Sequence, residues 1–228
     1  MTRQIVLDTE TTGLSPQDGH RVIELGCVEL LNRRFSGNNF HAYINPGRAI
    51  DAGAMRVHGI SNEFLKDKPR FEMLIESFID YISGAELIIH NASFDVGFLN
   101  SEFKLVGAKY KTIETHSSVL DTLSVARRLH PGQKNSLDAL CKRYNVNNAN
   151  RQLHGALLDA ELLAHVYLAM TGGQVTMFGE ASQSIAQIAE TVPITSSTRN
   201  YSLPVIAASE EELLAHTEFL SSVGIVED

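Results

Sequence analysis

Two short apolar segments each run directly into polar side chains. Ile5-Val6-Leu7 is followed by Asp8, and Leu87-Ile88-Ile89 is followed by His90-Asn91. Apolar runs of this length, without polar alternation, are typical of strands that are buried on both faces of a sheet. Such a sheet needs helices on both faces, so these segments predict an α/β protein with polar residues gathered where strands end.

The order of the other patterns refines this fold. Strand signals come first, around a polar turn at 37–39, and strands then alternate with helical apolar spacing. This order predicts a mixed β-sheet flanked by helices. The expected strands are 5–7, 22–31, 40–44, 87–89 and 119–120. The expected helices are 71–82, 94–106, 123–129, 136–144 and 155–170.

Acidic charge is concentrated near the end of the sequence. The whole chain has a net charge of −8, but residues 174–228 hold one basic residue, Arg199, against eight acidic ones, which gives −7. Residues 1–173 hold 18 basic and 19 acidic side chains, a net charge of −1. The overall acidity therefore does not exclude a polyanionic partner for the first region.

The composition also changes at residue 174, which predicts a boundary after a domain at 1–173. Residues 174–208 are rich in Gln, Ser, Thr and Ala without sustained periodicity, so we expect a flexible linker. Ser209 and the three glutamates after it are typical of a helix start. We expect a short amphipathic helix in 209–228 that docks on a partner protein, or else packs on its own domain.

Cysteine usage and hydropathy argue against two classes of protein. Cys27 and Cys141 are too few for a disulfide framework, so we expect two buried thiols and a cytoplasmic location. No apolar run reaches the roughly 18 residues that a membrane span needs. The early charges at Asp8 and Glu10 also argue against a secretory signal peptide.

Three clusters carry candidate chemistry. Asp8 and Glu10 are two residues apart, so in a strand they project to the same face and repel each other unless a cation lies between them. Asp95 lies just past the end of another strand. His154 precedes the last helix, where its imidazole is able to lean over a site that Asp159 also reaches.

Each of these residues alone also has a structural interpretation, as a strand-end carboxylate, a helix-dipole partner or a structural histidine. Together, four carboxylates suit two Mg²⁺ or Mn²⁺ ions, which activate a water and stabilise the departing oxygen of a phosphodiester. A histidine that titrates near neutral pH is a suitable general base for that water. The combination therefore favours metal-dependent hydrolysis.

The sequences DTETTG, HNASFD and HGALLDA resemble, in this order, the three motifs of the DEDDh family of 3′–5′ exonucleases. The resemblance covers about residues 3–171 and implies a fold related to ribonuclease H. No position departs from the motifs, so the resemblance implies an intact site with two divalent metal ions and a general base, His154. The implied metal-binding and catalytic carboxylates are Asp8, Glu10, Asp95 and Asp159.

The resemblance also implies contacts to the terminal nucleotide of the substrate. These contacts are Glu10, Thr11, Val57, His58 and Phe94. Alternatively, His58 is an exposed loop histidine, before a short helix that Ser61 caps, and Phe94 is core packing rather than a stacking platform. Asp121 is either a residue near His154 or a plain helix cap.

Further segments resemble the proofreading subunits of bacterial replicative DNA polymerases, among them 2–7, 38–41, 135–141 and 167–173. In those proteins a tether joins the nuclease domain to the polymerase (alpha) subunit, which implies that 209–228 binds alpha. Residues 174–178 resemble a sliding-clamp-binding pentapeptide, with contacts from Gln174, Met177 and Phe178. A small theta-type subunit is a further implied partner.

We therefore expect a proofreading 3′–5′ exonuclease of a replicase, which releases terminal nucleotides of DNA as 5′-monophosphates. Two alternatives stay open: a stand-alone nuclease acting on RNA or single-stranded DNA ends, and a scaffold with a vestigial site. The tail discriminates between the replicase subunit and the stand-alone nuclease, because a free-standing nuclease needs neither tether nor docking helix. A domain with so little positive charge is expected to hold DNA weakly and to depend on tethering.

Overall fold

The computed structural model describes residues 2–149, 151, 153–172 and 209. The linker expected at 174–208, with its clamp-binding segment, lies outside these residues, and so does the helix expected after Ser209. The fold below is that of the first region.

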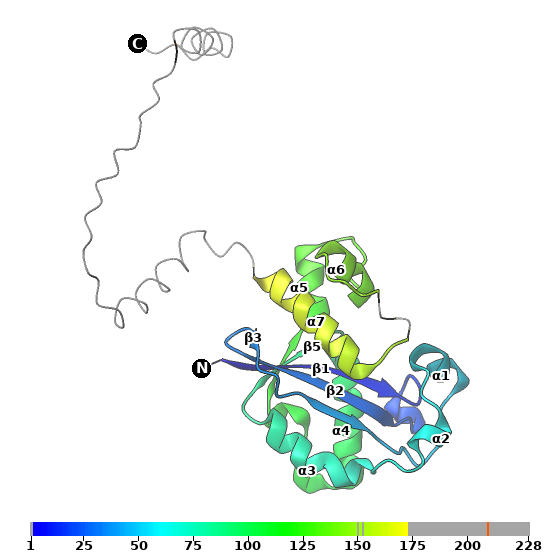
Figure 1. Ribbon diagram of the computed structural model, residues 1–228. Coiled ribbons are helices and arrows are strands. Elements are labelled where there is room, and N and C mark those ends of the chain that lie inside the picture. The colour runs from blue at the N-terminus through cyan, green and yellow to red at the C-terminus, as the bar shows by residue number, and fades with distance from the viewer. Residues whose placement is uncertain (1, 150, 152, 173–208, 210–228) are drawn as a thin grey trace, which may run out of the picture. The chain divides into compact units, whose positions relative to one another are not determined.

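A six-stranded mixed sheet forms the centre of this region (Figure 1). Its strands are β1 (Arg3–Thr11), β2 (Val22–Leu31), β3 (Arg34–Phe35), β4 (Phe40–Tyr43), β5 (Glu86–Ile89) and β6 (Ser118–Asp121). The strand order is β3-β2-β1-β5-β6, and β4 pairs with the middle of β2. β2 is antiparallel to β1, whereas β1, β5 and β6 are parallel, so β1 is the central strand on which the two kinds of pairing meet.

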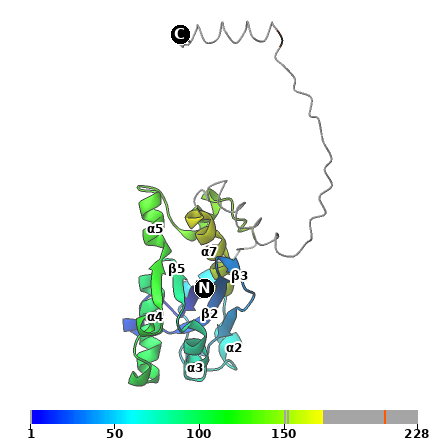
Figure 2. The same cartoon turned by 90° about the vertical axis from the view of Figure 1, so that its left-hand side faces the viewer.

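Helices cover both faces of the sheet. They are α1 (Ala52–His58), α2 (Asn62–Leu65), α3 (Phe71–Ile82), α4 (Ala92–Val106), α5 (Thr122–Leu129), α6 (Leu137–Arg143) and α7 (Ala156–Thr171). Single 3₁₀ turns cover Pro16–Asp18, Ala108–Tyr110 and Ile113–Thr115. In both views, β2 lies between α7 and α3 (Figures 1 and 2).

The two faces of β1 belong to two separate cores. Ile5 and Leu7 pack with residues of α3 and α4, whereas Val6 packs with residues of α5, α6 and α7. This alternation along a single strand, with apolar contacts on both sides, is what the unbroken apolar run predicted. The predicted α/β class, mixed sheet and flanking helices are confirmed.

Element bounds agree best where the apolar pattern is long. The predicted strand 22–31 and helix 71–82 have the same ends in the structure. The predicted end of the first strand at Leu7 is wrong, because β2 pairs with β1 as far as Thr11. Asp8 consequently lies within a strand, not after one.

Two elements were not predicted. β3 has two residues and forms a hairpin with the end of β2. α1 has the sequence AGAMRVH, which is too short to show a helical apolar pattern; the left-handed Gly59 (φ 73°) ends it. Both elements are held by tertiary contacts rather than by a pattern of their own.

Two smaller predictions are confirmed. Cys27 and Cys141 are buried free thiols. The side chain of Ser61 accepts a hydrogen bond from the N–H of Phe64 and so caps α2. Within the described ranges, no helix has the length and apolar content needed to cross a membrane.

Candidate active site

Strand β1 directs Asp8 and Glu10 to the face of the sheet that α7 covers. Side chains alternate along a strand, and Val6 lies in the core beneath α7, so the residues two and four positions later share its face. Glu10 is buried and Asp8 is half-buried. The two carboxylates therefore have the common orientation that their spacing predicted.

Gly26 on β2 allows the start of α7 to reach these carboxylates. Gly26 pairs directly with Asp8 across the β1–β2 ladder. A Cβ at this position would lie 2.2 Å from backbone atoms of Ala156 and Leu157, far inside any real Cβ contact. The missing side chain thus sets how closely the first turn of α7, which carries Asp159, approaches the sheet.

Asp95 enters the site from the first turn of α4. This helix follows β5 directly, through Asn91, whose backbone is left-handed (φ 62°). Asp95 is buried, and its Oδ1 accepts a hydrogen bond of 2.7 Å from the hydroxyl of Thr9. Asp121 accepts from the N–H of Asn91 and caps α5, so its interpretation as a helix cap is the right one.

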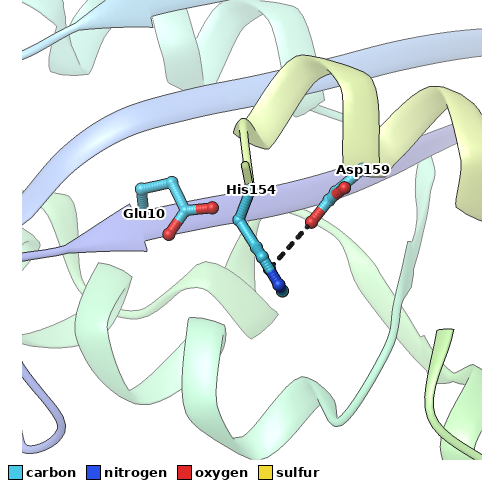
Figure 3. A group of neighbouring side chains, drawn as sticks. All are labelled: Glu10, His154 and Asp159. Carbon is cyan, nitrogen blue, oxygen red and sulfur yellow. Dashed lines mark ion pairs between the residues drawn. The ribbon is translucent and has the colours of Figure 1, made fainter. Parts of the chain in front are cut away.

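His154 and Asp159 lie at the start of α7, as predicted. The N–H of His154 donates to the carbonyl of Val57 at 3.1 Å, which ties this segment to the end of α1. Nδ1 of His154 lies 3.3 Å from Oδ2 of Asp159. Potential ligand atoms of Glu10, His154 and Asp159 all lie within 4.8 Å of one another, although the three residues come from β1 and from the start of α7 (Figure 3).

Three carboxylates of the site, those of Asp8, Glu10 and Asp95, resist ionisation. Burial is the largest cause: it raises the pKa of Asp8 well above its usual value, that of Glu10 to about 8 and that of Asp95 to about 7. Repulsion adds to burial, with Asp95 the strongest neighbour of Asp8 and Asp159 the strongest neighbour of Glu10. The site therefore favours a cation that neutralises its acids.

Arg151 belongs to the cluster and was not predicted. Its guanidinium donates to both carboxylate oxygens of Asp159 and to Nδ1 of His154, and it also donates to Asp138. The sequence signal for it is weak, because it is a lone cation in the polar segment that precedes HGALLDA. Its contacts depend on how that segment folds back on α7.

The cluster lines a cleft of about 880 Å³. Among its lining residues are all five predicted catalytic and metal-binding positions: Asp8, Glu10, Asp95, His154 and Asp159. A second cavity, of about 440 Å³, shares Glu10 and Phe94 with this cleft. The predicted nucleotide contacts all line this second cavity: Glu10, Thr11, Val57, His58 and Phe94.

The structure excludes one interpretation of His58 and leaves both interpretations of Phe94. His58 is 5% exposed, so it is not a solvent-exposed loop histidine. Its Nδ1 accepts a hydrogen bond of 3.0 Å from the N–H of Ile60, and burial lowers its pKa, so the neutral ring carries its proton on Nε2. Phe94 packs against Phe98 at a ring distance of 4.9 Å and also lines both cavities, so core packing and access to a ligand coexist.

The donor set fits divalent metal ions. Carboxylate oxygens suit Mg²⁺ and Mn²⁺, and an imidazole is an acceptable ligand for Mn²⁺. Burial raises the pKa values of Asp8, Glu10 and Asp95, and a bound cation would favour their ionised forms. Asp8, Glu10, Asp95 and Asp159 are the residues that would hold the ions.

Comparison with known proteins assigns the chain to a family. A family model described as Exonuclease matches residues 5–167. DNA polymerase III subunit epsilon from Salmonella typhimurium is 51% identical over 228 residues, which are 98% of this chain and 94% of that protein. The chain belongs to the epsilon family of exonucleases. The protein of the same name from Escherichia coli K12 is 50% identical, with the same two coverages, and that from Rickettsia felis is 49% identical over 97% of this chain and 96% of its own length.

Solved structures share the fold of this epsilon family member. Exonuclease X in complex with 5′ overhanging duplex DNA has a TM-score of 0.60 and 28% identity, covering 76% of this chain and 94% of that one. The nuclease domain of 3′hExo, a DEDDh family member bound to rAMP, has a TM-score of 0.64 and 18% identity, covering 75% and 92%. The predicted ribonuclease H-like fold and the predicted exonuclease activity are confirmed.

Proposed function

We propose that this epsilon family member removes nucleotides from the 3′ end of DNA by hydrolysis that depends on two divalent metal ions. The DEDDh exonucleases are metal-dependent enzymes. The observation that supports the proposal is the convergence of one histidine and four carboxylates on a single cleft. Bound Mg²⁺ or Mn²⁺ supplies an activated water and neutralises charge on the phosphodiester.

His154 is the proposed general base. Its side chain is 43% exposed, in the cleft beside Asp159, where a water has access to it. It takes a proton from this water as the water oxygen bonds to the terminal phosphorus. The bond between phosphorus and the 3′ oxygen of the preceding nucleotide breaks, that oxygen takes up a proton, and a nucleoside 5′-monophosphate leaves.

The second cavity is the proposed site of the terminal nucleotide. Phe94 lies between the two cavities, where a ring is able to stack on a base. Nε2 of buried His58 has no hydrogen-bond partner in the described part of the chain, which leaves its N–H to donate to a ligand. A mismatched end frays more easily than a paired one, so it reaches this site more often without any reading of bases.

The relatives are named as subunits of DNA polymerase III, and we propose that this chain proofreads for such a polymerase in the cytoplasm. We propose that residues 209–228 bind the alpha subunit and that 174–178 bind the sliding clamp through Gln174, Met177 and Phe178. A theta-type subunit is a third proposed partner. The net charge of −1 on residues 1–173 supports this arrangement, because tethering replaces the DNA affinity that surplus Lys and Arg would give.

The catalytic assignment is tested with the Asp8→Ala/Glu10→Ala variant on a labelled primer with a mismatched 3′ end. We expect the release of 5′-monophosphates to fall below detection, because two of the four proposed metal-binding carboxylates are removed. Glu63→Ala is the matched control, since it removes an exposed carboxylate that lies outside the cleft and pairs with Lys66. Normal turnover by the double variant would refute the assignment.

The replicase assignment is tested by deleting residues 174–228. We expect hydrolysis of single-stranded DNA to persist, because every proposed catalytic, metal-binding and nucleotide-binding residue precedes the deletion. Co-purification with the polymerase should be lost. Unchanged co-purification would favour a stand-alone nuclease or a different docking surface.

A further inference from the structure

Arg151 contacts two proposed functional residues, Asp159 and His154, but the proposed function gives it no role. Its side chain is 7% exposed. Nε and Nη2 donate to the two carboxylate oxygens of Asp159, and Nη2 also donates to Nδ1 of His154. Nη1 donates to Oδ1 of Asp138 at 2.7 Å.

One nitrogen of this guanidinium contacts two proposed functional atoms at once. Nη2 is 2.7 Å from Oδ2 of Asp159 and 2.9 Å from Nδ1 of His154, and those two atoms are 3.3 Å apart. A two-point ion pair occupies both oxygens of Asp159 in the geometry that arginine favours. The same carboxylate cannot turn freely toward a metal ion while this pair persists.

We propose that Arg151 is a positioning residue that holds the place of a divalent cation in the metal-free protein, and that metal binding displaces its guanidinium from Asp159. The inference rests on the metal site proposed above. Asp138, whose side chain is 60% exposed at the edge of the same cleft, provides a second acidic partner. The guanidinium therefore keeps a charged contact after Asp159 is released.

The direction in which metal affinity changes when Arg151 is replaced distinguishes competition with the metal from a merely structural role. If Arg151 only supported the fold of the site, its loss would weaken metal binding. If Arg151 competes with the metal, its loss tightens metal binding. We therefore propose titrating the full chain with Mn²⁺, detected by electron paramagnetic resonance, in the absence of DNA.

Arg151→Gln should bind Mn²⁺ about tenfold more tightly than the natural chain, equivalent to about 1.4 kcal/mol. Arg127→Gln is the matched control, because Arg127 lines the same cleft but is not a hydrogen-bond partner of Asp159 among the described residues. Its effect should stay below about twofold. Equal tightening of Mn²⁺ binding by both variants would mean that loss of any positive charge in the cleft has this effect, which would contradict a specific role of Arg151. Unchanged or weaker Mn²⁺ binding by Arg151→Gln would also overturn the proposal.

Arg151→Lys keeps the test decisive if the neutral variant folds poorly. Lysine retains the charge but has no planar fork, so it should still release Asp159 more readily and bind Mn²⁺ more tightly than arginine does. Thermal unfolding in EDTA provides a second readout: Arg151→Gln should have a lower Tm than the natural chain and a larger rise in Tm on adding Mn²⁺. Absence of Mn²⁺ binding by the natural chain would contradict the proposed metal site itself, which is a different result from equal binding by the variants.

Discussion

The position of α7 against the sheet depends on Gly26, so Gly26→Ala is the sharpest perturbation of the site that leaves every proposed functional residue in place. The new Cβ would lie 2.2 Å from backbone carbon and nitrogen atoms of the first turn of α7. Ordinary contact begins at 3.4 Å, so the helix start must retreat by 1.2 Å, the difference between these distances, or the strand must bend by as much.

A retreat of this size moves Asp159 and His154 away from Asp8 and Glu10. Metal–ligand distances tolerate deviations of about 0.2 Å, and a misplacement of about 1 Å costs about 10²-fold in rate. We therefore expect Gly26→Ala to lower kcat by about 10²-fold and to weaken Mn²⁺ binding. Overpacking should also lower the free energy of unfolding by about 1–3 kcal/mol.

The assay must separate displacement from loss of folded protein. Exonuclease rates and Mn²⁺ affinity are measured well below the midpoint of thermal unfolding, where circular dichroism shows the variant to be folded. Gly97→Ala is the matched control, because it adds the same methyl group to an α4 glycine with no heavy atom within 4 Å of the new Cβ. If Gly26→Ala kept wild-type rate and Mn²⁺ affinity despite reduced stability, the close approach at Gly26 would not position the site.

Three further predictions follow from the same structure. Burial raises the pKa of Glu10 to about 8 and of Asp95 to about 7, so the folded chain retains protons that the unfolded chain has lost. Calorimetry in EDTA should therefore show Tm falling as pH rises from about 5 to 8. Added Mn²⁺ should reverse this fall. His58→Ala should raise KM more than it lowers kcat in steady-state kinetics, because His58 lines the proposed nucleotide cavity and not the carboxylate cluster. Glu102→Ala should cost about 2–3 kcal/mol in denaturant unfolding, since the buried Glu102 accepts two hydrogen bonds from Arg21.

The elements that the sequence predicted well are those whose own apolar pattern decides their structure. β2 is a ten-residue strand, and the pattern of α3 buries one face, so neither needs information from elsewhere in the chain. α1 is too short to show such a pattern in the sequence. It forms because Gly59 ends it and because its Ala54 and Met55 pack against a small core that includes Ile23. A local sequence pattern does not predict such tertiary contacts.

The same division applies to the site. Asp8, Glu10 and Asp95 were predictable because each stands in or beside an apolar strand, and motif order added Asp159. Arg151 was missed, since its role arises only when a polar segment folds back against the first turn of α7.

Gly26 is an intermediate case. A glycine inside the apolar strand VIELGCVELL signals a close approach, but the segment that approaches lies 130 residues later in the sequence, at Ala156. The sequence pattern thus indicates that another segment approaches Gly26 closely, but it does not identify Ala156 as that neighbour.

The strand pair at the site departs from a rule that favours stable sheets. Glu10 and Glu24 are buried and directly opposite each other on β1 and β2, where like charges destabilise the pair. One oxygen of Glu24 pairs with Nε2 of His41 at 2.7 Å, while the other has no hydrogen-bond partner in the described part of the chain. The opposed glutamates lower the free energy of unfolding at the place where cations are proposed to bind. A cation that binds only the folded chain would raise it again. The acidic site therefore makes metal binding a contribution to folding as well as to catalysis.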